Sequence, residues 1–212
     1  MSIPFITVEG PIGVGKTSLA KAISDTYQFE LLKEIVDENP FLDKFYSDIA
    51  EWSFQTEMFF LCNRYKQLSD IDKKCLSNKK AVAADYHIFK NLIFAKRTLS
   101  TLEYKKYEAI YQILTKDIPV PNIVIYLDAS VEVLINRIDM RGRDFEQKIS
   151  SDYLEQLSAD YRMFIDDFEE KHPEIQILRF NANEIDFVQN GQDLRMILDK
   201  VDETLQKRGF YK

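Results

Sequence analysis

The chain is poor in cysteine and in positive charge, and each shortage excludes a class of protein. Its 212 residues include only two cysteines, Cys62 and Cys75, without a C-x-x-C pair or a histidine cluster, so neither a disulfide framework nor a zinc site is indicated. Lys and Arg number 28 against 35 Asp and Glu, which gives a net charge of −7. Such a chain has no basic field to hold a nucleic-acid polymer or an anionic membrane, so a small molecule is the expected partner.

Long hydrophobic runs and targeting patterns are also missing. The opening MSIPFITVEG contains neither a basic segment nor a long apolar stretch, so we expect no transmembrane span and a cytoplasmic, reducing location. With 45% hydrophobic residues the chain can bury a core. Because no repeat, low-complexity stretch or Ser/Gly linker interrupts it, we expect residues 1–212 to form a single domain.

Glycine is scarce as well, and half of it serves one loop. Three of the six glycines lie in residues 10–17, which match the phosphate-binding pattern G-x-x-x-x-G-K-[ST] between a β-type run and a helical pattern. In such a loop the backbone N–H groups bind phosphate, the lysine reaches the β- and γ-phosphate oxygens, and the Ser/Thr hydroxyl binds Mg²⁺. We therefore expect a nucleoside triphosphate with Mg²⁺, held by Gly10, Pro11, Ile12, Gly13, Val14, Gly15, Lys16, Thr17 and Ser18, with Thr17 as a metal ligand.

Apolar patterning predicts an α/β fold. Short apolar runs that are typical of buried parallel strands occupy residues 3–8, 29–32, 81–84, 123–127 and 175–180. Amphipathic patterns predict helices near residues 51–68, 100–116, 130–140, 154–168 and 194–205, with Ser100 and Ser130 as caps. This alternation indicates a three-layer α/β/α domain of the P-loop NTPase type, with a five-stranded parallel sheet and a helical lid.

Charged residues outside the phosphate-binding loop suit phosphoryl transfer. Glu34 directly follows the second expected strand, where strand ends face the ligand crevice, and a carboxylate there can accept a proton from a sugar hydroxyl. Arg137, Arg141 and Arg143 lie in a glycine-containing segment, about 137–149, that can close as a lid over phosphates. A guanine-reading N-K-x-D tetrapeptide is absent, which disfavours a GTPase switch.

Taken together, these segments resemble the deoxyribonucleoside kinases. The resemblance rests on the phosphate-binding loop and on residues 34–46, residues 52–64, Asp85-Tyr86-His87 and residues 137–146, and it covers essentially the whole chain. Within that family the chain is most similar to bacterial deoxyguanosine kinases. The resemblance implies that ATP donates a phosphoryl group, with Mg²⁺, to the 5′-hydroxyl of a deoxynucleoside.

The resemblance also implies roles for individual residues. Glu34 is implied as the general base for the 5′-hydroxyl, and Lys16, Arg141 and Arg143 as the cations that stabilise the transferring phosphoryl group. Tyr46 is implied to hold the deoxyribose 3′-hydroxyl together with Glu146. The residues implied on the ATP side are Arg137, Arg141, Asp186 and Phe187. Those implied in the nucleobase slot are Phe54, for which core packing is an equal alternative, and Phe94.

Glu57 and Arg64 offer a basis for base selection. They are two helical turns apart and therefore share one face of a helix. Many relatives carry glutamine at the first position, and an amide offers one donor and one acceptor, whereas a carboxylate only accepts. Because guanine presents adjacent donors at N1 and the 2-amino group, we expect Glu57 to select guanine, with hypoxanthine second, while Arg64 donates to O6 and N7.

The segment after the third expected strand departs from the family pattern. Relatives carry Asp/Glu-Arg-Ser there, whereas this chain has Asp85-Tyr86-His87 and lacks the arginine. Asp85 remains a candidate for substrate and Mg²⁺ binding, and His87 can act either as a donor to phosphate or as a structural histidine. Asn91 is a further candidate contact to the guanine edge.

We therefore expect an enzyme that phosphorylates a purine deoxynucleoside, preferably deoxyguanosine. A deoxyadenosine/deoxycytidine kinase is the nearest alternative, followed by a nucleoside monophosphate kinase. A nucleotide-binding regulator without turnover is an alternative of a different class. Apolar stripes on the predicted helices near 51–68 and 100–116 can in addition seat a homodimer.

Overall fold

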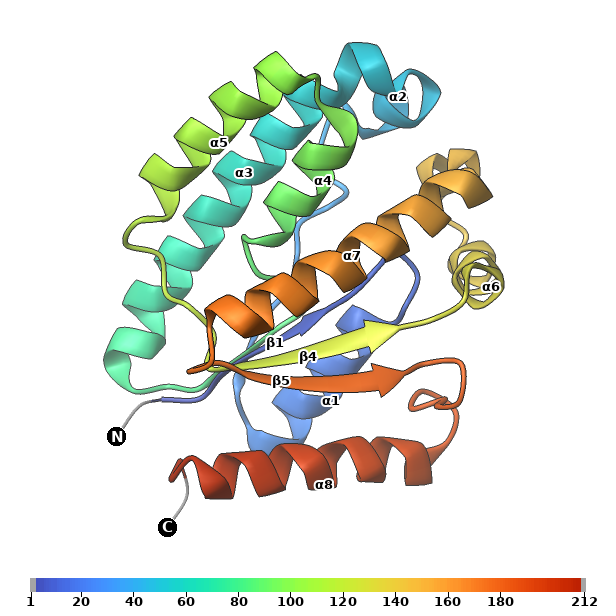
Figure 1. The fold of residues 1–212 in the computed structure, drawn as a ribbon. Helices are drawn as coiled ribbons and strands as arrows, with labels where there is room; N and C mark the ends of the chain where they lie inside the picture. Colours follow the sequence, from blue (N-terminus) through green and yellow to red (C-terminus); the bar gives the residue numbers. More distant parts are fainter. Residues whose placement is uncertain (1–2, 211–212) are drawn as a thin grey trace.

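The computed structural model describes residues 3–210 and contains one parallel sheet (Figure 1). Its five strands lie in the order β2-β3-β1-β4-β5, and each pair of neighbours is parallel. The strands are β1 (Phe5–Glu9), β2 (Glu30–Leu32), β3 (Val82–Ala84), β4 (Ile123–Asp128) and β5 (Gln176–Asn181). The five-stranded parallel sheet predicted from the sequence is confirmed, with strand ends within two residues of the expected positions.

Helices alternate with the strands and cover both faces of the sheet (Figure 1). The α-helices are α1 (Lys16–Tyr27), α2 (Leu42–Ser47), α3 (Ile49–Lys74), α4 (Lys90–Thr98), α5 (Thr101–Thr115), α6 (Val131–Arg141), α7 (Ser151–Lys171) and α8 (Gly191–Lys207). Two short 3₁₀ helices are η1 (Leu76–Asn78) and η2 (Asp144–Lys148). Among the residues that the structure describes, no helix is both long enough and apolar enough to cross a membrane.

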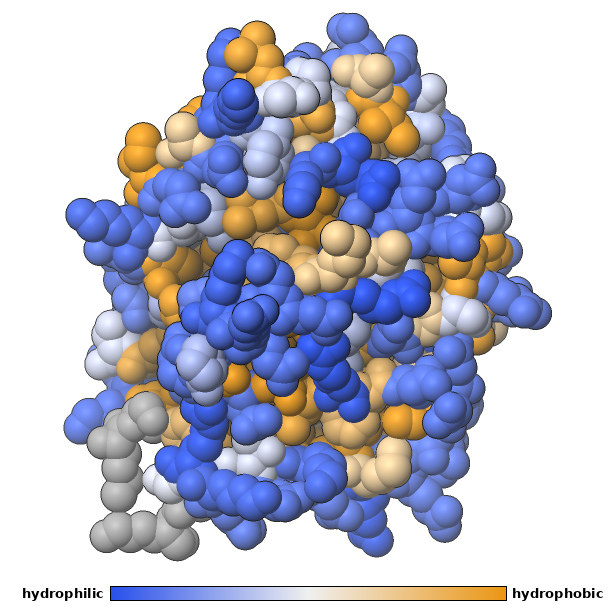
Figure 2. All heavy atoms as spheres, viewed as in Figure 1, coloured by the Kyte–Doolittle hydropathy of each residue, from blue (hydrophilic) through white to orange (hydrophobic). Residues whose placement is uncertain are grey.

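The core lies on the two faces of the sheet. All five residues of β1 are buried, as are the first five of β4, because parallel strands with helices on both sides have no solvent-facing side. Helices α1 and α8 pack on one face, and α3, α4, α5 and α7 lie on the other (Figure 1). The outer surface in the same view is mainly hydrophilic, with scattered hydrophobic side chains (Figure 2).

Local sequence signals define the ends of several helices. Ser100 and Glu103 form both halves of the expected capping box at the start of α5, and Ser130 accepts a hydrogen bond from Val133 N at the start of α6. The sequence analysis did not predict α2 and α4. Helix α2 has only six residues, and α4 begins without the side-chain cap that marks the starts of α5 and α6.

The core predicts which substitutions destabilise the fold. Leu61 of α3 is fully buried, whereas Met163 of α7 is 70% exposed. We expect Leu61→Ala to lower the free energy of unfolding by about 2–5 kcal/mol, because it leaves a cavity in a packed cluster. Met163→Ala, the control, should change it by about 0.5 kcal/mol or less. Chemical denaturation measures both, and equal effects would contradict the assignment of the core.

Candidate functional site

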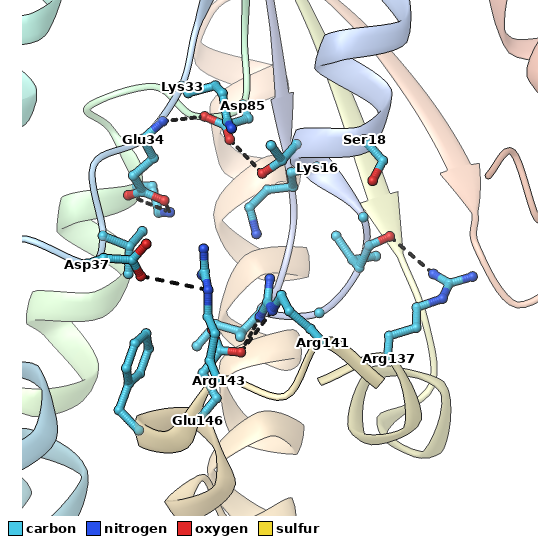
Figure 3. A pocket seen from close by; sticks show the side chains of 18 of the residues that line it. Lys16, Ser18, Lys33, Glu34, Asp37, Asp85, Arg137, Arg141, Arg143 and Glu146 are labelled. Atoms are coloured by element: carbon cyan, nitrogen blue, oxygen red, sulfur yellow. Dashed lines mark hydrogen bonds and ion pairs between the residues drawn. The ribbon is translucent and has the colours of Figure 1, made fainter. Parts of the chain in front are cut away.

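A cavity of about 690 Å³ opens where β1, β2 and β3 end. Its wall contains the end of the phosphate-binding loop, the polar face of α3 and the segment that follows α6. Figure 3 shows Lys16, Glu34 and Asp85 on one side of the cavity and Arg141, Arg143 and Glu146 on another. Since the carboxyl ends of parallel strands meet at one sheet edge, residues far apart in the sequence converge here.

The phosphate-binding loop has the backbone that its glycines permit. Gly10 has a φ of +146°, and a Cβ added to it would lie 2.3 Å from the Leu127 carbonyl oxygen. Gly15 has a φ of +105°, and its added Cβ would lie 2.8 Å from the Phe187 ring. Side chains at these positions would be strained and would also collide with neighbours, which explains why glycine is concentrated in this loop.

Lys16 is the first residue of α1, and its side chain folds back onto the backbone of the phosphate-binding loop. Its Nζ donates to the carbonyl oxygens of Gly10 and Pro11, both at 2.8 Å. Burial, together with the nearby charge of Lys90, lowers the pKa of Lys16 to about 7. An anion bound in the loop would favour the charged ammonium, so phosphate binding and protonation of Lys16 support each other.

Asp85 connects the phosphate-binding loop to the segment after β2. Its Oδ2 accepts from the Thr17 hydroxyl at 2.6 Å, and its Oδ1 accepts from the Glu34 backbone N at 2.7 Å. The adjacent Thr17 and Asp85 oxygens are the kind of donors that Mg²⁺ prefers, so these residues fit the predicted metal. Within residues 3–210, no cluster of three or more His, Cys, Asp or Glu could hold a metal ion by itself. The donor set suits an ion bound largely by phosphate oxygens and water.

Glu34 is held between two cations. Arg64 donates to its Oε1 through Nε at 2.9 Å and through Nη2 at 2.5 Å, and Lys90 Nζ lies 3.1 Å from Oε1 and 2.9 Å from Oε2. Burial alone would raise the pKa of Glu34, but the charges of Lys90 and Arg64 lower it to about 2. The carboxylate is therefore ionised throughout the neutral range.

Lys90 is a site residue that sequence reasoning missed. It opens α4, its side chain is 5% exposed, and it lines the cavity. The only signal in the sequence is its position shortly after a strand end, and such a lysine is more often exposed. Its contact with Glu34 is made across 56 positions of the chain, which a local pattern does not reveal.

Glu57 is a buried carboxyl group in the cavity wall. The residue is 2% exposed, and its Oε2 has no hydrogen-bond partner among the described residues. Burial raises its pKa to about 7, although the charges of Arg64 and Lys90 oppose the rise. A buried acceptor without a partner is costly, so this oxygen can receive a hydrogen bond from a ligand in the cavity.

Two residues considered for the nucleobase slot, Phe54 and Asn91, do not line the cavity. Phe54 packs against the hydrophobic cluster of α3, α4 and α5 rather than lining the cavity, whereas Phe60 lines it and lies 4.5 Å from the Arg64 guanidinium. Asn91 is fully buried behind Arg64: its Oδ1 accepts from Arg64 Nη1, and its Nδ2 donates to Tyr107 OH. Phe54 lies on another face of α3 than Phe60, and Asn91 points toward Arg64 and Tyr107 rather than into the cavity. Phe94 does line the cavity, as expected.

The predicted lid segment carries an ion-pair cluster. Glu146, 4% exposed, pairs with Arg141 at 2.6 Å and with Arg143 at 3.4 Å (Figure 3). Tyr46 lines the cavity beside them, and its ring stacks on Phe145 with centroids 6.4 Å apart. Burial, followed by the charge of Glu146, raises the pKa of Tyr46, so its hydroxyl stays protonated and can donate.

Three of the residues predicted on the ATP side, Arg137, Asp186 and Phe187, lie near the phosphate-binding loop, whereas Arg141 pairs with Glu146. Arg137 donates to the backbone oxygens of Val14 and Ala182 at 3.1 and 3.0 Å, and its contact with the phosphate-binding loop is visible in Figure 3. Asp186 and Phe187 also line the cavity, and Asp186 accepts from the backbone N of Val188 and Gln189. These contacts fix the loop that follows β5 beside the phosphate-binding loop.

The fold and the loop define a P-loop protein with a cavity beside the loop, and comparison with known proteins narrows the class. The sequence model of the family described as deoxynucleoside kinase matches residues 6–206. The chain is 51% identical over 202 residues to deoxyguanosine kinase of Bacillus subtilis, covering 95% of this chain and 98% of that protein. It is 31% identical to deoxyadenosine/deoxycytidine kinase of the same organism, covering 92% and 90%.

Solved structures agree with this result. Deoxyadenosine kinase from M. mycoides, solved with bound dATP and also with dCTP, matches with a TM-score of 0.79 and 26% identity, covering 94% of this chain and 99% of that one. The chain belongs to the deoxynucleoside kinase family and is a transferase. The P-loop NTPase-type fold predicted from the sequence is therefore confirmed.

The buried carboxyl of Glu57 predicts a pH-dependent stability effect. Since its folded-state pKa of about 7 lies above the ordinary glutamate value of 4.5, stability is lost as the pH rises through this interval. We expect Glu57→Gln to raise the free energy of unfolding at pH 8, by about 1–3 kcal/mol, and to have less effect at pH 5. Glu155→Gln, at an exposed position of α7, is the control. Chemical denaturation at pH 5 and at pH 8 measures both variants. Equal effects of the two substitutions at both pH values would contradict the prediction.

Proposed function

We propose that this protein transfers the γ-phosphoryl group of ATP to the 5′-hydroxyl of deoxyguanosine. The observation that carries the proposal is the buried, unpartnered Oε2 of Glu57, in the same cavity as the phosphate-binding loop and Glu34. The 51% identity to deoxyguanosine kinase of Bacillus subtilis supports the same acceptor.

Glu57 matches guanine in hydrogen-bond polarity. Guanine carries N1–H and a 2-amino group side by side, and an ionised carboxylate can accept from both. Arg64 uses three of its five N–H groups on Glu34 and Asn91, which leaves two for guanine O6 and N7. Adenine has an acceptor at N1, which an ionised Glu57 would repel, so deoxyadenosine is the weaker substrate.

Tyr46 and Glu146 suit the deoxyribose. Both line the cavity at the end that the lid segment covers, and one can donate while the other accepts. A 3′-hydroxyl between them would have a partner for its proton and for its oxygen. This pairing would orient the 5′-hydroxyl toward Glu34 and the phosphate-binding loop.

The chemical step needs few groups from the protein. Glu34 accepts the proton of the 5′-hydroxyl as the oxygen bonds to the γ-phosphorus, and the bond to the β-phosphate oxygen breaks to release ADP. Lys16 neutralises the β- and γ-phosphate oxygens, and Arg141 and Arg143 approach the transferring group from the lid segment 137–149. Thr17 and Asp85 would hold Mg²⁺, whose chemistry is to neutralise charge on the phosphates.

ATP is the proposed donor, with its adenine near Asp186 and Phe187. Arg137 lies between the loop that contains them and the phosphate-binding loop. The acceptor end of the cavity, by contrast, contains Glu57 and Glu146. The cations at that end are already paired, Arg141 and Arg143 with Glu146 and Arg64 and Lys90 with Glu34, so an acceptor that already carries a phosphate fits less well.

We also propose that residues 1–212 act as one domain in the cytoplasm, where a reducing environment keeps Cys62 and Cys75 free. A homodimer is proposed through α5, on which Leu102 and Ile113 are 65% and 75% exposed and three turns apart. Size-exclusion chromatography with light scattering tests this, and Ile113→Lys should give a monomer.

One assay tests the proposed function. ATP consumption is measured with deoxyguanosine, deoxyinosine, deoxyadenosine, deoxycytidine and the corresponding monophosphates. We expect the highest kcat/KM with deoxyguanosine. Turnover with monophosphates alone would favour a monophosphate kinase, and no turnover with any acceptor would favour a non-catalytic nucleotide-binding protein.

The pKa of Glu57 predicts that base preference depends on pH. Because kcat/KM reports the free enzyme, in which Lys16 loses its charge over the same interval as Glu57 gains one, the ratio of kcat/KM for deoxyguanosine to that for deoxyadenosine isolates Glu57, and it should rise about tenfold from pH 6 to pH 8. A protonated carboxyl offers one donor and one acceptor, which suits adenine, so the deoxyguanosine-to-deoxyadenosine ratio should rise with pH.

Glu57→Gln is the matched variant for this measurement. An amide does not titrate, so its ratio of kcat/KM values should be lower and independent of pH. A ratio that stays the same in the variant, or that does not change with pH in the natural protein, would remove Glu57 from base selection.

A further inference from the structure

The end of β3 delivers no cation to the cavity. Tyr86, which stands where relatives carry an arginine, is fully buried, and its hydroxyl donates to Gln67 Oε1 at 2.8 Å. His87 is 5% exposed with Nε2 3.0 Å from the Pro119 carbonyl oxygen, and burial lowers its pKa to about 4. The imidazole is therefore neutral at pH 7 and is held by the core.

Lys90, at the start of α4, places an ammonium group at the cavity wall near the end of β3. Its Nζ bridges the two oxygens of Glu34 and lies 5.5 Å from the centre of the Phe94 ring, at the cavity wall. Glu34 Oε1 also accepts from Arg64, whereas the bond recorded for Oε2 comes from Lys90. Oε2 is thus the oxygen that becomes available when Lys90 moves.

The two cations on Glu34 differ in how firmly they are held. The Arg64 guanidinium is planar, stacks on Phe60 and donates to Asn91, which in turn bonds to Tyr107. Lys90 has a compact ammonium on a flexible four-carbon stem. Movement of Lys90 therefore requires only rotation of its side chain, while movement of Arg64 would break a buried network.

The position of Lys90 also relates it to the phosphate-binding loop. Its charge is the largest influence after burial that lowers the pKa of Lys16. The ammonium groups of Lys16 and Lys90 both line the cavity, so their positive charges repel each other. An anion bound between them would reduce this repulsion. In a phosphotransferase, the anion that reaches this point is the transferring phosphoryl group.

We propose that Lys90 supplies the cation of the acceptor end, in place of the missing arginine. In the ligand-free protein it holds Glu34. During transfer its ammonium moves to the phosphoryl oxygens, and Glu34 Oε2 takes the proton from the 5′-hydroxyl. The bond between the 5′-oxygen and phosphorus forms, and the bond from phosphorus to ADP breaks with its electron pair on ADP. This inference rests on the proposed function.

The experiment compares Lys90→Met with Lys96→Met, an exposed position on the same helix. With deoxyguanosine and ATP, we expect Lys90→Met to lower kcat about 100-fold or more while KM for deoxyguanosine changes only a few-fold, and Lys96→Met to leave both unchanged. Lys90→Arg should recover at least a tenth of the lost kcat. Thermal unfolding of each variant shows whether it is folded.

Chemical rescue separates a direct role from a structural one. Lys90→Ala leaves space for a small amine, so added methylammonium should raise its kcat saturably and should not affect Lys90→Met. A Lys90→Met kcat within threefold of the natural protein would overturn the proposal. So would loss of activity in every Lys90 variant without rescue by arginine or amine, because that pattern indicates a structural role. If the natural protein itself has no turnover, the proposed function fails and the role of Lys90 fails with it.

Discussion

The balance of charge inside one cavity is the constraint on which the rest of the site depends. Lys16, Arg64 and Lys90 line it together with Glu34, Glu57 and Asp85, and Glu9 is fully buried nearby. Burial raises the pKa of Glu9 and of Glu57 to about 7. With Glu9, Glu57 and Lys16 each near half-ionised at neutral pH, about two and a half positive charges are opposed by about three negative charges, and this group of residues is close to neutral.

The fold explains how so many charges come to one place. Glu9, Glu34 and Asp85 each follow or end a strand, and parallel strands present these ends at a single edge. The cations come from the helices that begin or pass at that edge, with Lys16 on α1, Arg64 on α3 and Lys90 on α4. The parallel sheet therefore fixes the carboxylates, and the helices provide the groups that compensate them. The bonds between Glu34 and these helices in turn tie α3 and α4 to the sheet.

Sequence reasoning succeeded where the signal was local. The phosphate-binding loop, the five strands and the capping box of Ser100 each depend on neighbouring residues, and the structure contains all of them. It left two readings open for Phe54, which packs in the core, while Phe60, six positions further along α3, lines the cavity. It also overlooked Lys90, because a buried lysine is recognisable only from its partner, and Glu34 is 56 positions away. The roles of individual site residues remain proposals, since they concern ligands.

A base with a pKa of about 2 is compatible with phosphoryl transfer. A strongly paired carboxylate is a weak base and could not remove a proton from an unreacted sugar hydroxyl. In a loose transition state, however, the bond to the leaving group is largely broken before the new bond is formed, and the hydroxyl becomes acidic only as its oxygen bonds to phosphorus. The proton is then transferred late, when Lys90 has left Glu34 and the pKa of the carboxyl has risen. In this order of events the ion pair between Lys90 and Glu34 slows the reaction little. The phosphoryl group draws Lys90 away at the stage when Glu34 is needed as the base.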